Sequence, residues 1–332
     1  MPRGKQFVIG CMSDALSALH CERACAALRE AHPHAEFVSA AETAARPAAG
    51  QTRGRAGRAK SAITDAVCAS EPPRHHDARR AGGAVVRRLA KGEIDIGVVD
   101  ARRIPLQLPE PIEIAAVLER TNPFDVLISC EDLILDEQPE NTCIAVLDAV
   151  KRGQLLYYRP DLRLVEAPDD FDGLFDAMQR GDIDAFVYPA ADVEALNRQM
   201  HVVEVFTTSI CTPPGGQGAQ VLLVRRDRRD IGALVRGLND PSSAAEIELE
   251  RMLLEHLARD GRGPVGVLGN VEESVFELEA AIAAPDGTEK ISATAGGSLA
   301  ERSKIVMRLA AELLASGGDE ILAPYRRARG GG

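Results

Sequence analysis

One short pattern occurs twice in this chain, and it constrains the fold more than any other feature. The two copies are KGEID at residues 91–95 and RGDID at residues 180–184, and each is followed by an apolar run. In both, a basic residue ends a helical stretch, a glycine allows the left-handed turn at the helix C-terminus, and acid-Ile-Asp leads into a buried strand. The repeat predicts two equivalent α/β halves.

The other apolar runs alternate with stretches of helical spacing, which is typical of parallel sheets built from βαβ units. Predicted strands lie at 6–10, 34–39, 112–117, 126–129, 143–147, 162–165 and 220–224, and predicted helices at 83–91, 147–157, 169–179 and 192–199. Beyond residue 225 we predict helices at 230–238, 242–259 and 298–316, with strands at 265–268 and 276–284. These patterns predict one lobe at 1–118 with 203–225, a second lobe inserted at 119–202, and an α+β domain at 226–332.

Charge is distributed unevenly along the chain. The net charge is −11, yet residues 41–90 hold ten basic and four acidic residues. Residues 40–76 are rich in Ala, Gly, Arg and Pro, a composition that predicts a long mobile loop. Its basic stretch at 53–60 touches RNA, acts as a targeting patch or is simply solvated, and the lack of aromatic residues there favours the solvated loop. The acidic balance and the 4% aromatic content exclude a general nucleic-acid binder.

The cysteines indicate the compartment. Seven cysteines, an odd number without any CxxC pair, predict reduced thiols in the cytoplasm rather than a disulfide framework. No apolar run approaches the roughly 18 residues of a membrane span, and the first residues do not resemble a signal peptide. His20, Cys21 and Cys25 share one predicted helix, but a zinc site would need a second pair of ligands. We interpret them as buried small residues and expect no metal.

The glycines at 215, 216 and 218 have two interpretations. They could cradle a phosphate, or they could form a crossover between the lobes. The absence of a P-loop lysine and of the dinucleotide-binding spacing favours the crossover.

Taken together, seven segments in order resemble the porphobilinogen deaminase (hydroxymethylbilane synthase) family. They are IDIGVV at 94–99 with the following Ile104-Pro105, ERTNPFD at 119–125, RPDL at 159–162, PPGGQGA at 213–219, APDG at 284–287, SLA at 298–300 and AELL at 311–314. The resemblance implies two lobes like those of type II periplasmic binding proteins, and a C-terminal domain whose cysteine carries a covalent dipyrromethane cofactor. It also implies a cytoplasmic monomer.

The family joins four porphobilinogens, with loss of ammonia, in tetrapyrrole and haem biosynthesis. This transferase chemistry needs a thioether anchor, a carboxylate that stabilises an azafulvenium cation, and many arginines for the substrate carboxylates. The resemblance therefore implies where such residues should stand in this chain.

This chain departs from the family at most of those positions. Gly261 stands at the implied position of the cysteine, so we expect no dipyrromethane. Arg103 stands where the resemblance implies the aspartate, Arg102 where it implies a lysine, and Met12 where it implies an arginine. The family's basic stretches fall on 145–151 and 167–170. Of their anion-binding groups, only Lys151 and the adjacent Arg152 remain. We assign no catalytic residue, and the cleft candidates are Met12, Arg102, Arg103, Asp148, Lys151, Arg152, Asp169, Asp170 and Gln217.

Two functions remain open. The residues favour a catalytically impaired homologue that acts as a binding or regulatory scaffold, with a small anionic pyrrole as its ligand. The alternative is an active hydroxymethylbilane synthase with a rearranged site. Such a site would use Cys11, Cys130 or Cys211 with Asp100 or Asp148.

The cleft candidates also differ in charge between the lobes. Arg102 and Arg103 lie in the first lobe, whereas the second lobe presents Asp148, Asp169 and Asp170. Arg102 and Arg103 form either an anion site or solvated charges. If the opposite charges meet in a partly desolvated cleft, they favour lobe closure without a ligand. If they point to water, they contribute little.

Overall fold

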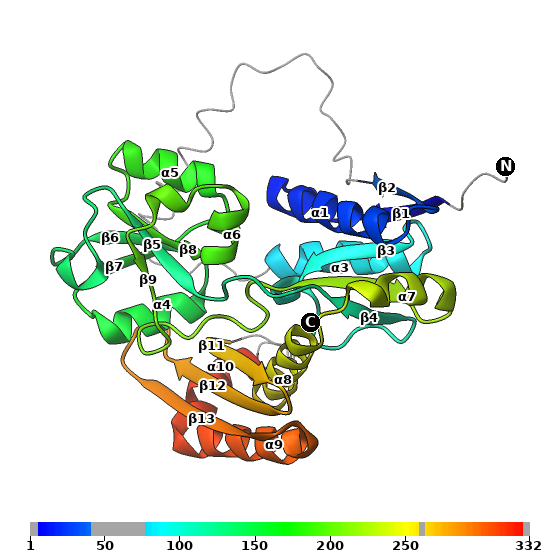
Figure 1. Ribbon diagram of the computed structural model, residues 1–332. Helices are drawn as coiled ribbons and strands as arrows, with labels where there is room; N and C mark the ends of the chain where they lie inside the picture. Colours follow the sequence, from blue (N-terminus) through cyan, green and yellow to red (C-terminus); the bar gives the residue numbers. More distant parts are fainter. Residues whose placement is uncertain (1–5, 41–76, 259–262, 328–332) are drawn as a thin grey trace.

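The computed structural model describes residues 6–40, 77–258 and 263–327. Figure 1 shows two lobes side by side, with a third domain packed beneath them. All but the first residue of the predicted loop at 40–76 lies outside the described residues, and so does Gly261. Within the described residues, no helix is long and apolar enough to cross a membrane.

Lobe 1 is built on a five-stranded sheet in the order β2-β1-β3-β10-β4. Its strands are β1 (Gln6–Gly10), β2 (Glu36–Ala40), β3 (Ile96–Asp100), β4 (Ile112–Val117) and β10 (Gln220–Arg225). Strands β1, β2 and β3 are parallel, and β10 runs antiparallel to both β3 and β4. Helices α1 (Ala15–Ala31) and α7 (Arg229–Val235) bury their apolar side chains on one face, and α3 (Asp77–Ala90) packs on the other.

Lobe 2 repeats this plan with the sheet order β7-β6-β8-β5-β9. Its strands are β5 (Asp125–Ser129), β6 (Cys143–Val146), β7 (Arg163–Glu166), β8 (Ala185–Pro189) and β9 (Glu204–Val205). Helices α5 (Phe171–Gln179) and α6 (Ala190–Ala195) cover one face, and α4 (Ala149–Tyr158) covers the other. The chain then returns to lobe 1 through β10, so the second lobe is inserted in the first.

The third domain is an antiparallel three-stranded sheet with helices packed on it. Its elements are α8 (Pro241–Ala258), β11 (Val265–Glu272), β12 (Val275–Ala283), β13 (Lys290–Ser298), α9 (Arg302–Leu313) and α10 (Asp319–Arg327). Residues from the sheet and from these helices form one apolar core. The architecture is therefore α/β, with two lobes of the periplasmic-binding-protein type and a C-terminal α+β domain.

The repeated sequence pattern forms the same local structure in both lobes. Gly92 and Gly181 have left-handed φ values of 72° and 76° at the ends of α3 and α5. The second acid of each copy binds the backbone of the neighbouring strand. Asp95 Oδ2 accepts from Val8 N at 2.9 Å, and Asp184 Oδ2 accepts from Cys143 N at 2.7 Å. The pattern thus ends a helix and aligns two parallel strands.

Several predicted boundaries differ from the structure. Residues 290–298 form β13, which the sequence analysis did not predict because its small and polar side chains lack a strong apolar alternation. The helix predicted at 298–316 begins instead at Arg302, and α10 follows a kink at Gly317. The helix predicted at 192–199 spans Ala190–Ala195. Strand β9 pairs with β5, so the second sheet extends past residue 202.

Candidate functional site

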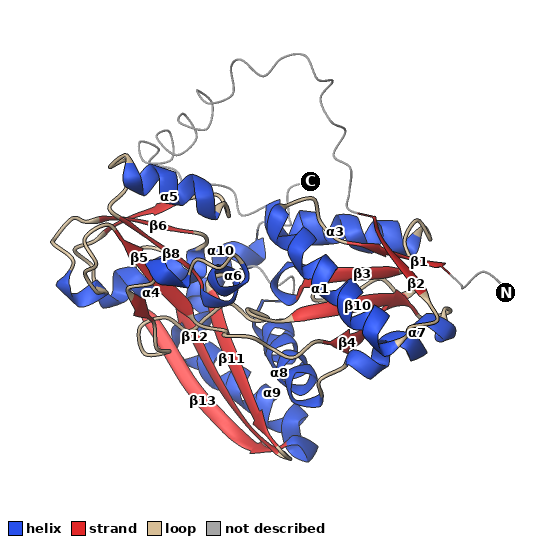
Figure 2. Ribbon diagram, turned by 45° about the horizontal axis from the view of Figure 1, so that its top comes forward, coloured by secondary structure: helices blue, strands red, loops and turns tan. Residues whose placement is uncertain are grey.

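The carboxyl ends of the parallel strands of both lobes face the same interlobe cleft, where ligands of open α/β sheets bind. The loops after β1 and β3 provide the lobe 1 wall, and those after β6, β7 and β8 provide the lobe 2 wall. Helix α6 of lobe 2 lies beside α1 of lobe 1 (Figure 2), and Arg23 Nη2 donates to Ala195 O at 3.5 Å there. The predicted cleft candidates lie on or beneath these walls.

Arg102 is held by carboxylates from both lobes. Its Nε donates to Asp100 Oδ2 at 3.0 Å, and its Nη2 donates to Asp192 Oδ2 at 2.8 Å across the cleft. The Arg102 side chain is only 11% exposed. Burial acts to raise the pKa of Asp100, but the charge and hydrogen bonds of Arg102 outweigh it and lower that pKa. Burial raises the pKa of Asp192 to about 6, even though Arg102 opposes this shift.

Arg103 makes the second contact between the lobes. Its guanidinium pairs with Asp169 of lobe 2 and lies 3.5 Å from Asp14 Oδ2 of lobe 1. The Tyr188 hydroxyl donates to Asp169 Oδ1 at 2.6 Å and so orients this carboxylate. Burial, followed by the charge of Asp169, raises the pKa of Tyr188. Of the predicted opposite charges, Arg103 and Asp169 therefore meet, whereas Asp148 pairs with Lys151 and Asp170 caps α5 within lobe 2.

Lys151 does not line the cleft as a free cation, contrary to its assignment as a surviving anion-binding group. Its side chain is 0% exposed, and its Nζ lies 2.9 Å from Asp148 Oδ2 and 3.4 Å from Asp125 Oδ1. Burial acts to lower the pKa of Lys151, but the two carboxylates outweigh it and raise that pKa. Burial raises the pKa of Asp125. Lys151 is thus a buried cation neutralised by its own lobe.

Gln217 links these two charge clusters. Its Nε2 donates to Asp125 Oδ1 at 3.0 Å and to Pro123 O at 2.8 Å. Its Oε1 accepts from Arg102 Nη1 at 3.4 Å and from Lys151 Nζ at 3.5 Å. Because Gln217 lies in the segment that returns from lobe 2 to lobe 1, one polar network joins the two lobes.

Helix N-termini could also bind anions, since their free N–H groups and dipoles favour negative charge. In this chain those positions are taken by aspartates of the chain itself. Asp14 accepts from Ser17 N at 2.8 Å, Asp148 from Lys151 N at 3.0 Å, and Asp170 from Gly173 N at 3.2 Å. Helices α1, α4 and α5, which begin at the cleft, are therefore already capped by negative charge, whereas the short α6 has no side-chain cap.

The remaining cleft candidates are not positioned for ligand binding. Met12 is 3% exposed and belongs to the apolar core of lobe 1, so its assignment to the cleft is wrong. Arg152 donates to Leu164 O at 2.6 Å and thus ties α4 to β7 instead of serving as an anion site.

The glycines of the crossover have a structural role. Gly216 has φ 90°, and a Cβ there would lie 2.7 Å from the backbone of Ala101, while Gly218 has φ 78°. A side chain at Gly216 would clash with the backbone of Ala101, and one at Gly218 with that of Thr121, so both glycines serve the packing of the crossover.

Of the six cysteines in the described residues, five are buried and Cys130 is exposed. Cys21 and Cys25 are buried in the lobe 1 core, and the described residues hold no cluster of His, Cys, Asp or Glu fit for a metal ion. Cys11 and Cys211 are buried as well, and Cys211 Sγ lies 3.8 Å from Asp125 Oδ2, beside the Lys151 cluster. Cys130 is exposed, but it follows β5, which runs antiparallel to β8 and therefore ends at the sheet edge opposite the cleft.

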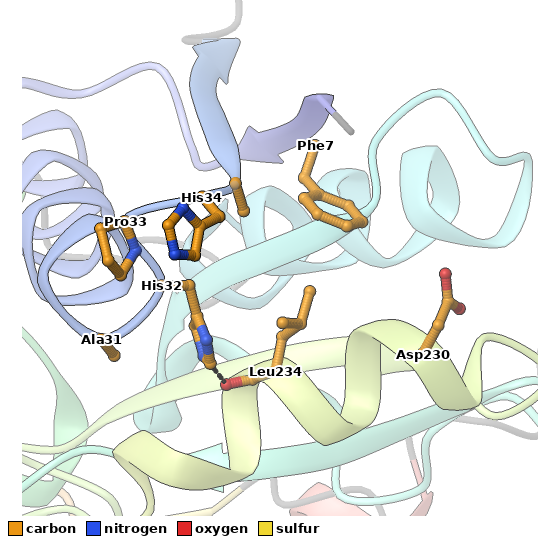
Figure 3. A pocket seen from close by; sticks show the side chains of 8 residues that line it. Phe7, Ala31, His32, Pro33, His34, Asp230 and Leu234 are labelled. Atoms are coloured by element: carbon orange, nitrogen blue, oxygen red, sulfur yellow. Dashed lines mark hydrogen bonds between the residues drawn. The ribbon is translucent and has the colours of Figure 1, made fainter. Parts of the chain in front are cut away.

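A surface hollow of about 420 Å³ lies near the start of β1, at the sheet edge opposite the cleft (Figure 3). Phe7, Pro33 and Leu234 give it a largely apolar lining. His32 Nε2 lies 2.8 Å from Leu234 O, so this ring ties the end of α1 to α7. We therefore interpret the hollow as part of the packing between α1 and α7 and not as a ligand site.

Comparison with known proteins identifies the family. The family model for porphobilinogen deaminase, dipyromethane cofactor binding domain, matches residues 83–233. A porphobilinogen deaminase of Pelotomaculum thermopropionicum is 34% identical over 239 residues, which covers 72% of this chain and 77% of that protein. One of Moorella thermoacetica is 33% identical over 242 residues, with 73% and 77% covered. This chain belongs to the porphobilinogen deaminase family.

Among solved structures, the substrate-binding domain of a putative molybdenum ABC transporter from Clostridium difficile is similar, with a TM-score of 0.42 and 12% identity. The match covers 74% of this chain and 96% of that chain.

Three residues of the site escaped the sequence analysis. Asp192 stands three residues after the end of β8, as Arg103 does after β3, so the repeat itself could have indicated it. Tyr188 lies inside a buried strand, where the apolar pattern indicated core packing only. Asp125 is the first residue of β5 and was noted only as the end of the segment at 119–125. Membership of a tetrapyrrole-forming family thus comes with a cleft whose charges are paired internally.

Proposed function

We propose that this chain is a porphobilinogen deaminase homologue that does not carry out the family's polymerisation and acts instead as a binding or regulatory scaffold. One observation carries the proposal. Arg103 occupies the position where the family resemblance implies the cation-stabilising aspartate, and its guanidinium is already paired with Asp14 and Asp169. An arginine stays protonated at neutral pH and repels the developing positive charge of an azafulvenium.

The charges of the cleft also argue against a bound dipyrromethane. Such a cofactor presents several carboxylates, which need free arginines or open helix N-termini. Here Arg102 and Lys151 are each shared by two carboxylates, and aspartates cap α1, α4 and α5 where these helices begin at the cleft. The described cleft residues therefore do not fit the group.

The test is incubation of the purified protein with porphobilinogen, followed by denaturation, Ehrlich staining and intact mass measurement. We expect the sequence mass alone and no uroporphyrin after oxidation of the mixture. The porphobilinogen deaminase of Moorella thermoacetica, treated in parallel, is the positive control. A mass increase of one dipyrrole would contradict the proposal, and peptide mapping to Cys11, Cys130 or Cys211 would support the rearranged active site instead.

The ligand of the scaffold is proposed to be a small anionic pyrrole that binds weakly. Calorimetric titration with porphobilinogen at low and high salt measures this. We expect affinity weaker than micromolar, because a ligand must first displace the internal carboxylates from the arginines. Micromolar binding that weakens with salt would show that the cleft is still a functional anion site.

A further inference from the structure

The contacts that join the two walls of the cleft are made by two neighbouring arginines. Arg102 and Arg103 lie in the short 3-10 helix Ala101–Arg103 of lobe 1, and each reaches a different element of lobe 2. Arg103 pairs with Asp169, just before α5, and Arg102 pairs with Asp192 in α6. The two pairs have different environments and therefore different roles.

The Arg102–Asp192 contact fixes where the lobes meet but adds little net attraction. Both side chains are nearly buried, with 11% and 3% exposed. Desolvation of a buried pair commonly offsets its Coulomb gain, whereas its directional hydrogen bonds still select one geometry. Asp100 already neutralises Arg102 from within lobe 1, so this arginine is paired whether the lobes are open or closed.

The Arg103–Asp169 contact is better placed to hold the lobes together. The two side chains are 12% and 28% exposed, so they lose only part of their hydration while salt screens them incompletely. Both partners are positioned in advance, Arg103 by Asp14 in lobe 1 and Asp169 by the Tyr188 hydroxyl in lobe 2. This positioning reduces the side-chain entropy that usually weakens a surface ion pair.

We infer that Arg103 and Asp169 form a lock that keeps the lobes closed in the ligand-free protein, an autoinhibitory contact across the cleft. The lock rests on the proposed function insofar as it regulates access to the same cleft. The lock can nevertheless be tested separately from the proposed function, because closure of the lobes is measured without any ligand. An active enzyme could possess the lock, and an inactive scaffold could lack it.

Solution X-ray scattering and hydrogen exchange of the full chain, both without porphobilinogen, test the lock. Asp169→Arg places two cations face to face, so we expect a larger radius of gyration and about fivefold faster exchange at residues 101–103 and 169–173. Arg103→Asp combined with Asp169→Arg restores an opposite pair and should recover part of the closure. Asp172→Asn is the matched control, because Asp172 lies on α5 and pairs with Arg198 within lobe 2.

Salt provides a measurement that needs no variant. In about 1 M NaCl the screening length falls to about 3 Å, so the wild type should shift toward the scattering profile of Asp169→Arg. Scattering and exchange that are the same in the wild type and Asp169→Arg at both salt levels would overturn the lock. Opening by the single variant without recovery in the double variant would also overturn it, because local damage then explains the change. Asp169→Asn serves if the reversed charge prevents folding.

Discussion

Lys151 and Arg103 are both cations held between two carboxylates, and comparing them shows how burial changes the role of the same chemistry. Lys151 and Asp125 are 0% exposed, whereas the partners of Arg103, Asp14 and Asp169, are 41% and 28% exposed. In the first cluster Asp148 is 31% exposed, but water cannot reach Lys151 or Asp125 to replace a lost partner, so these two charges are needed for folding. In the second, water and salt compete, so the pair can open and close. Lys151 is a determinant of lobe 2 stability, and Arg103 is a conformational contact.

The largest effect is expected from Lys151→Met. Removing the cation leaves Asp125 buried without compensation, which should lower the free energy of unfolding by about 3–5 kcal/mol. Urea denaturation measures the change, with Lys304→Met on the exposed face of α9 as the control. Adding Asp125→Asn to Lys151→Met should recover most of the loss. A loss below about 1 kcal/mol would mean that Lys151 is no more critical than a surface charge.

Asp192→Asn should give an intermediate effect that depends on pH. The pKa of Asp192 is raised to about 6 from 3.8, so the folded state binds this proton more tightly than the unfolded state does. The stabilisation from protonated Asp192 is present below about pH 4 and is lost as the pH rises through about 6. Relative to the wild type, the variant should therefore gain roughly 2–3 kcal/mol between these limits.

The measurement is a series of denaturation curves for the wild type and Asp192→Asn across that pH range. Asp172→Asn, whose carboxylate is 79% exposed, is the control for the loss of one charge from lobe 2. Parallel stability curves for the wild type and Asp192→Asn would contradict the raised pKa. Asp192 would then behave like the exposed carboxylates that pair with Arg103.

The smallest effect on stability is expected from Arg103→Gln. The pair is partly exposed, so its loss should change the free energy of unfolding by less than about 1 kcal/mol. The same variant should nevertheless open the cleft in solution scattering. A destabilisation as large as that of Lys151→Met would remove the distinction between the two clusters.

Much of the fold could be predicted because it depends on local patterns. The repeated glycine and Asp-containing turn predicts both lobes, since left-handed residues and buried strands leave clear marks in the sequence. Strand β13 could not be predicted in the same way. Its small residues form a strand because β12 offers a nine-residue partner, which is a tertiary cause.

The charges of the cleft were predicted by residue type but not by direction. Arg103 and Asp169 carry opposite charges on facing loops, and they form the expected pair. Lys151 instead points into lobe 2. Nothing in the sequence around residue 151 shows that Asp125, which is 26 positions away, lies beside it. The side-chain direction of a helical residue depends on which face packs, and Gln217 and Asp125 decide that only after the crossover has formed.

The position of β10 determines the order in which the chain can complete its sheets during synthesis. This strand lies between β3 and β4, so β4 has no neighbour in the lobe 1 sheet until residues 220–225 have left the ribosome. All strands of the lobe 2 sheet, from Asp125 to Val205, emerge before then. The lobe 2 sheet can therefore be completed before the lobe 1 sheet, although lobe 1 begins earlier in the chain. A nascent chain that stalls between residues 206 and 220 would present β3 and β4 as unpaired edges, which are sites for aggregation or chaperone binding.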